Sequence, residues 1–218
     1  MIQLIDRKTA LQHQTLAAHV YSLQEMMYNP ANDPDIKKTN AAFRKLKAEY
    51  QVLKDDNPAE IYELQGSYIY NLPTVPLAEY VKNLGSCLTA YAQYTSSPLT
   101  FILDYSIPWL SQTNDFEPVL EAMTHLRSIG IDDKYIGAIR VDGEELSAVV
   151  HAVFWLGRCN ANLPYCWFVP EEQGIVGSIC KHGNIHFDAY IPEEKEELAS
   201  FITAQQLVEI DTCVDGFL

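Results

Sequence analysis

The sequence has few basic residues for its length. Of its 218 residues, 15 are Lys or Arg and 29 are Asp or Glu, so the formal net charge is −14. Proteins that bind nucleic acids or anionic lipids through charge depend on clustered Lys and Arg. The shortage of both residues excludes nucleic-acid and membrane partners of this kind, and it favours a basic protein partner instead.

Long apolar runs and an export signal are also missing. The longest nearly uncharged apolar stretch, 146–157, is shorter than the roughly 20 residues of a membrane-spanning helix. The first residues do not follow the positive-then-apolar order of a signal peptide. The cysteines are odd in number and include no Cys-x-x-Cys pair, so reduced thiols are expected at Cys87, Cys159, Cys166, Cys180 and Cys213. We therefore expect a soluble cytoplasmic protein.

The common catalytic and cofactor motifs are absent. The chain contains no Gly-x-Ser-x-Gly elbow, no phosphate-binding loop and no dinucleotide fingerprint. Cys166 lies among aromatic residues and His151 lies in an apolar helical segment, so both are interpreted as core residues. A Cys₃His zinc site is conceivable, but its spacing is unlike that of zinc proteins: Cys159, Cys166, Cys180 and His182. The sequence predicts no metal ligand and no cofactor.

Helical spacing of apolar residues dominates the first 130 residues. One such face ends at a break over 29–32, and Asp33-Pro34 then begins a second helix, so 9–55 is predicted to form a helical hairpin. Further helices are predicted after Pro58, after Pro76 and over 116–129. The segments 66–72 and 98–105 fit either a helix or a strand.

After Gly130 the pattern becomes mixed. A strand over 135–141 is followed by a buried helix over 144–156, and Pro192 begins a final helix. Between them, β-branched and aromatic runs predict a small antiparallel meander of three strands: 164–169, 175–181 and 185–191. The predicted fold class is α+β, with a mainly helical region (1–130) and an α+β region (131–218). No linker separates them, so they form either two domains or one shared core.

The last predicted hairpin carries the best candidate for acid–base chemistry. A two-residue turn at Gly183-Asn184 would pair Lys181 with His186, and alternation would place His186 and Asp188 on one face. The other face would carry Cys180, His182, Ile185 and Phe187. A carboxylate near an imidazole can orient it as a general base. A solvated polar sheet face explains the same pattern, so both interpretations stay open.

The negative charge is confined to one part of the chain. Residues 61–218 hold 21 acidic and seven basic side chains, whereas 1–60 are balanced. Two acidic clusters begin predicted helices, where the helix dipole favours them, and they also form a surface that attracts a basic partner. Tyrosines recur on the helix predicted after Pro76. Tyrosine is common both at binding hot spots and at core boundaries.

The leading hypothesis is an acidic protein-binding module, for example an immunity or inhibitor protein that neutralises a basic toxin or nuclease. The partner-binding residues predicted for it are Tyr80, Tyr94, Asp142, Glu144, Glu145, Glu193, Glu194 and Glu197. The alternative is an enzyme whose acid–base site is His186 and Asp188. A third hypothesis is a homodimer built on the hairpin 9–55, and the oligomeric state stays open.

Overall fold

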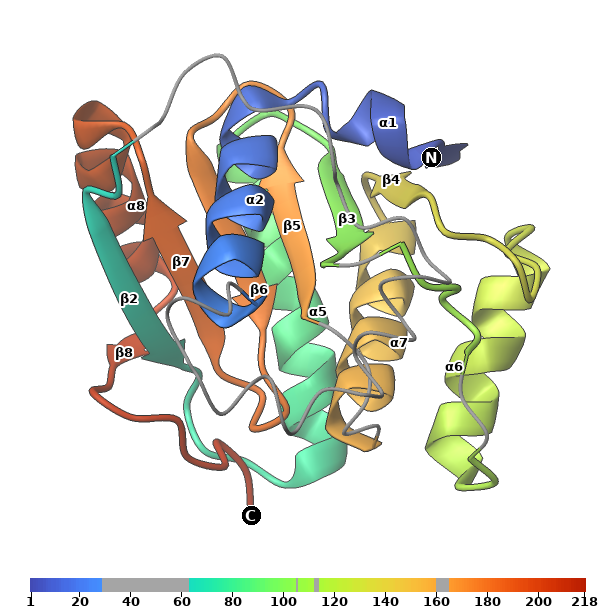
Figure 1. Ribbon diagram of the computed structural model, residues 1–218. Helices are drawn as coiled ribbons and strands as arrows, with labels where there is room; N and C mark the ends of the chain where they lie inside the picture. The colour runs from blue at the N-terminus through green and yellow to red at the C-terminus, as the bar shows by residue number, and fades with distance from the viewer. Residues whose placement is uncertain (29–62, 105, 112–113, 160–164) are drawn as a thin grey trace.

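A single eight-stranded sheet organises the chain in the computed structural model (Figure 1). The structure describes residues 1–28, 63–104, 106–111, 114–159 and 165–218. The strand order is β1-β4-β3-β5-β6-β7-β2-β8, and the strands that pair along it are antiparallel. Together with the helices on its faces, this sheet confirms the predicted α+β class.

The strands come from both sides of residue 130. The predicted meander is present as β5, β6 and β7, and the ambiguous segments 66–72 and 98–105 form the strands β2 and β3. The strands are β1 (Ile2–Ile5), β2 (Gly66–Asn71), β3 (Leu99–Leu103), β4 (Ala138–Val141), β5 (Cys166–Pro170), β6 (Ile175–Ile179), β7 (Ile185–Ala189) and β8 (Val208–Glu209). Three strands therefore lie within the region whose sequence pattern is mainly helical.

Helices cover both faces of the sheet. Figure 1 shows α2 in front of the sheet, α5, α7 and α8 behind it, and α6 beside α7. Their bounds are α1 (Arg7–Ala10), α2 (Gln14–Tyr28), α5 (Leu77–Tyr94), α6 (Glu117–Ser128), α7 (Glu145–Cys159) and α8 (Pro192–Ala204). The second helix of the predicted hairpin, and the start of the helix predicted after Pro58, fall outside the described residues. None of the described helices has the length and apolar character that crossing a membrane requires.

Strand alternation divides the apolar side chains between two layers. In β5, Phe168 packs behind the sheet with Tyr91 and Phe187, whereas Trp167 and Val169 pack in front of it beside α2. Each fully buried side chain of this size contributes about 1.5–3 kcal/mol to folding. The layer behind the sheet also buries α7, as its apolar sequence predicts.

The β6–β7 connection differs from the predicted two-residue turn. Its ladder pairs Ser178 with His186, so residues 180–184 lie between the strands and Lys181 does not pair with His186. The observed register is shifted by three residues from the predicted one. Because three is an odd number, the side chains of β6 lie on the opposite face, relative to those of β7, from the face predicted for them. Cys180 therefore lies on the same face of the sheet as His186, not on the opposite face.

A glycine in the left-handed region explains the longer turn. The Gly183 amide donates to the Cys180 carbonyl (2.9 Å), and the Cys180 amide donates to the Asn184 carbonyl (3.0 Å). Gly183 has φ of 82°, a conformation that glycine adopts without steric cost. This combination is typical of the three-residue hairpin loop, in which a glycine follows the tight turn.

Candidate functional site

His186 and Asp188 lie on one face of β7, but different groups surround them. Nε2 of His186 is 3.4 Å from the Sγ atom of Cys213, whereas a carboxylate oxygen of Asp188 is 3.7 Å from Nδ1 of His19. Burial lowers the pKa of His186 and raises the pKa of Asp188. Within the described ranges, no hydrogen bond or ion pair joins the two side chains. This arrangement does not favour the acid–base pair on which the enzyme hypothesis depends.

Asp188 belongs instead to a buried cluster between α2 and the sheet. His19 is 2% exposed, its Nδ1 atom is 2.7 Å from the Tyr190 hydroxyl, and its ring contacts Trp167 edge-to-face with the ring centres 4.2 Å apart. Burial lowers the pKa of His19 to about 4, so this imidazole is neutral at pH 7. The cluster therefore acts as a packed polar contact that holds α2 to the sheet.

His186 belongs to a second cluster, with two thiols. Its ring, Cys180 and Cys213 place one nitrogen and two sulfur atoms within 4.8 Å of one another, and all three side chains are half-buried. Both cysteines are free thiols. We call Cys180, His186 and Cys213 the thiol–imidazole cluster. Of the residues weighed for a zinc site from the sequence, only Cys180 belongs to it.

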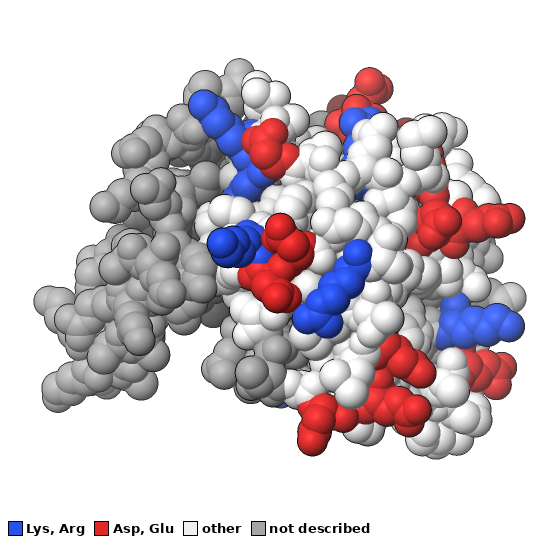
Figure 2. Space-filling model, turned by 90° about the vertical axis from the view of Figure 1, so that its right-hand side faces the viewer, with Lys and Arg blue, Asp and Glu red and all other residues white. Residues whose placement is uncertain are grey.

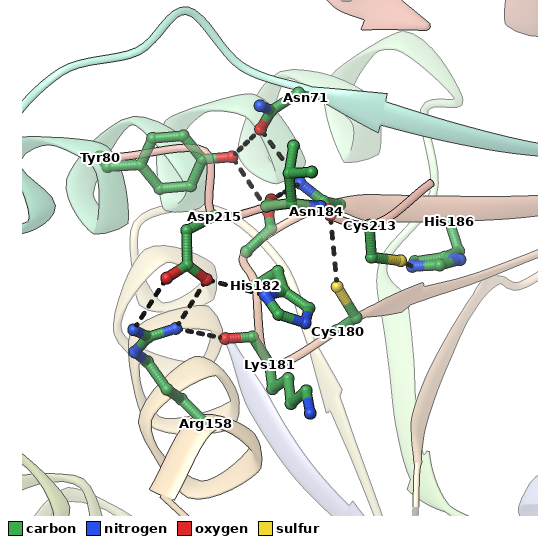
Figure 3. Close-up of polar contacts among 12 residues, drawn as sticks. Asn71, Tyr80, Arg158, Cys180, Lys181, His182, Asn184, His186, Cys213 and Asp215 are labelled. Atoms are coloured by element: carbon green, nitrogen blue, oxygen red, sulfur yellow. Dashed lines mark hydrogen bonds and ion pairs between the residues drawn. The ribbon is translucent and has the colours of Figure 1, made fainter. Parts of the chain in front are cut away.

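Asn184 holds the two cysteine-bearing segments together (Figure 3). Its side-chain amide donates to the Val214 carbonyl (2.9 Å), and its Oδ1 atom accepts from the Val214 amide (3.2 Å). The Cys180 thiol also points toward this Oδ1 atom, at 3.7 Å. Asn184 is fully buried, and Asn71 and Tyr80 complete its hydrogen-bond network. The position of Cys213, next to Val214, is therefore set by the turn itself.

An ionic contact fixes the same chain segment further along. Asp215 accepts hydrogen bonds from Arg158 and lies 2.8 Å from Nδ1 of His182. The Arg158 guanidinium also lies over the Phe217 ring, 4.6 Å from its centre. Figure 3 shows Asp215 between Arg158 of α7 and His182 of the β6–β7 turn. We call 210–218 the tail, and these contacts attach it to α7 and to the β6–β7 turn.

The two predicted acidic clusters meet at one end of the sheet. Strands β4, β5 and β7 run toward this end, because each is separated from the next by one antiparallel strand. Acidic residues follow all three strands there, and we call them the acidic end: Asp142, Glu144, Glu145, Glu171, Glu172, Glu193, Glu194, Glu196 and Glu197. All are exposed except Glu194, which is half-buried and accepts a hydrogen bond from the Gly174 amide (2.6 Å).

Among the residues that the structure describes, few cations balance the acidic end. Arg140 pairs with Glu171, the amino group of Met1 pairs with Asp142, and the Lys195 ammonium lies over the Tyr68 ring. Elsewhere the charges are more mixed. Figure 2 shows the side formed by α6, where Lys and Arg lie beside Asp and Glu at several places on a largely uncharged surface. The acidic end therefore carries a large share of the net negative charge.

The two tyrosines predicted to bind a partner have opposite surroundings. Tyr80 is 0% exposed and its hydroxyl donates to Asn71 (2.6 Å), so this prediction is wrong: the helix face that carries Tyr80 points into the core. Tyr94 is 47% exposed and donates to the Glu197 carbonyl (3.1 Å), which places it at the acidic end.

A pocket of about 190 Å³ also opens at the acidic end, lined by Met1, Gln3, Pro98, Arg140 and Asp142. Pockets for small-molecule ligands measure about 300–1,000 Å³, so this one fits a single side chain better than a metabolite.

No family model, curated protein or solved structure matches the chain. The geometry alone therefore indicates function. Sequence reasoning missed His19, Tyr190, Cys213 and the contribution of Glu171 and Glu172 to the acidic end. The pair Glu171-Glu172, one residue after the predicted strand 164–169, was a usable signal for the contribution of these two residues.

Proposed function

We propose that the chain is a protein-binding module that uses its acidic end to capture a basic protein. The observation that supports this most is the convergence of acidic residues from three separate strand ends on one surface, with few cations beside them in the described part of the chain. The helix dipole explains why carboxylates occur where α7 and α8 begin. It does not explain the additional acidic residues of the β5–β6 turn.

Such a surface serves two purposes in recognition. Its field accelerates the encounter with a positively charged partner by a factor of about 10–10³ at low salt. Tyr94 then offers an aromatic side chain among the carboxylates, and the small pocket beside Arg140 offers room for one protruding side chain. An inhibitor or immunity protein for a basic toxin or nuclease fits these features.

The test compares two variants with the same net charge. The first reverses three charges at the acidic end: Glu144→Lys, Glu193→Lys and Glu197→Lys. The control reverses three exposed charges away from it, Glu79→Lys, Glu117→Lys and Glu121→Lys. Both sets change the formal net charge from −14 to −8. Each set also includes positions close to helix N-termini, so their costs in stability are similar.

Each protein is used as bait in a native cell extract at low and at high salt, and bound proteins are identified by mass spectrometry. We expect one basic protein, in about equal amount to the bait, with the wild type and the control at low salt. The acidic-end variant should not retain it, and high salt during loading should weaken capture because it screens the surface field. A partner that both variants retain equally, or no partner at all, would contradict the proposal.

A further inference from the structure

The thiol–imidazole cluster has the chemistry of a metal site. Thiolate sulfur and neutral imidazole nitrogen are the ligands that Zn²⁺ prefers. The three ligand atoms come from the residue directly after β6, from β7 and from the tail, so they converge only in the folded chain. Two neighbouring sulfur atoms alone would also suit a disulfide, but here an imidazole nitrogen lies within 4.8 Å of both sulfur atoms.

One of the three distances between the ligand atoms matches a tetrahedral zinc ion. With Zn–S of about 2.3 Å and Zn–N of about 2.0–2.1 Å, tetrahedral geometry places neighbouring sulfur and nitrogen ligands about 3.5 Å apart. The observed separation of Cys213 Sγ and His186 Nε2 is 3.4 Å. The remaining pairs lie within 4.8 Å. Small side-chain rotations therefore bring all three ligands to bonding distance.

The surroundings hold the ligands in place and control their reactivity. Asn184 ties the Cys180 turn to the backbone beside Cys213, as described above. Burial raises the pKa of the Cys180 thiol to about 11, which keeps it protonated and slow to oxidise at pH 7. A divalent cation displaces such protons directly, because the metal–thiolate bond replaces the lost solvation.

We propose that Cys180, His186 and Cys213 bind one Zn²⁺ ion, which clamps the tail to the β6–β7 hairpin. Two thiols lose their protons to solvent when the ion binds, and His186 coordinates through its neutral Nε2 atom. The three protein ligands leave the fourth position of the tetrahedron for water. This inference is independent of the proposed function, because it involves no residue of the acidic end.

Zinc affinity is the first measurement. Untagged, reduced and metal-free protein competes with a chromophoric chelator for Zn²⁺, and we expect one ion per chain. Cys213→Ser and His186→Ala should each bind at least about 100-fold more weakly, since even loss of a hydrogen bond to a ligand costs 10–100-fold. Cys159→Ser is the matched control, because Cys159 is a half-buried thiol outside the cluster, and its affinity should equal that of the wild type.

Two further readouts keep the result interpretable if a variant folds poorly. In the wild type, Zn²⁺ should protect Cys180 and Cys213 from alkylation, leave Cys159 reactive, and slow amide exchange in the tail. The affinity should also rise with pH as two protons are released. Equal affinity in Cys213→Ser and the wild type would overturn the proposal. So would a reduced wild type in which Cys180 and Cys213 react with the alkylating reagent as fast with Zn²⁺ as without it.

Discussion

Acidification should destabilise the protein through His19. The pKa of this imidazole is lowered by burial from 6.5 to about 4, so the unfolded chain takes up a proton that the folded chain rejects. Stability falls once the pH drops below about 6.5, and the loss is complete below about 4. The full effect is about 3 kcal/mol, at 1.36 kcal/mol for each unit of pKa, and about 2 kcal/mol of it appears between pH 7 and pH 5.

The groups facing His19 affect this result in opposite directions. Burial raises the pKa of Asp188, so its own protonation in the folded state stabilises the protein on acidification. Tyr190 stays neutral throughout this range, because burial raises its pKa further. Both groups remain when His19 is replaced by Gln, which cannot titrate but keeps a polar side chain. The difference between the two proteins therefore isolates His19.

Urea denaturation of the wild type and His19→Gln at pH 7 and pH 5 measures the effect. Tryptophan fluorescence follows unfolding, and Trp167 lies against the His19 ring. At pH 7 the variant should be the less stable protein, and its deficit should shrink by about 2 kcal/mol at pH 5. An unchanged deficit would mean that His19 titrates alike in both states, and the argument from burial would be refuted.

Three more substitutions test the β6–β7 turn and the packing of α1. Asn184→Ala should lower the free energy of unfolding by about 2–4 kcal/mol in urea denaturation, because it removes the three hydrogen bonds that the buried Asn184 side chain makes to Val214 and Asn71. Gly183→Ala should cost about 1–2 kcal/mol or more in the same assay, since φ is 82° and the added Cβ would lie 2.7 Å from the Tyr80 ring. Arg7→Met should cost about 1.5–3 kcal/mol in thermal unfolding, because the buried guanidinium donates to two backbone carbonyls.

The local sequence pattern predicted those helices and strands in which one face is more buried than the other. β7 alternates between buried and half-buried residues, and α5 buries one stripe, so their periods could be read from the sequence. β3 is buried at every position in the middle of the sheet, which removes the alternation that distinguishes a strand from a helix. β1 is only four residues long and carries three apolar residues, too few to establish a period.

The sites depended on information that no local pattern contains. Gly183-Asn184 suits both a two-residue and a three-residue hairpin loop, and the choice between them decides which face receives Cys180. Cys213 joins His186 only because the tail returns to the β6–β7 turn. The acidic clusters were visible in the sequence, but their common location follows from the direction of β4, β5 and β7, which only the strand order supplies.

The place of β2 in the sheet has a consequence for biosynthesis. Gly66 pairs with Ala189, 123 residues further along the chain, and the other neighbour of β2 is β8. At a translation rate of about 5–20 residues per second, β7, the first partner of β2 along the chain, is synthesised roughly 6–25 s after β2. During that time its Tyr-Ile-Tyr core is an unpaired strand that can associate with other chains. The yield of folded protein should therefore depend on chaperones and on temperature during synthesis more than its final stability would suggest.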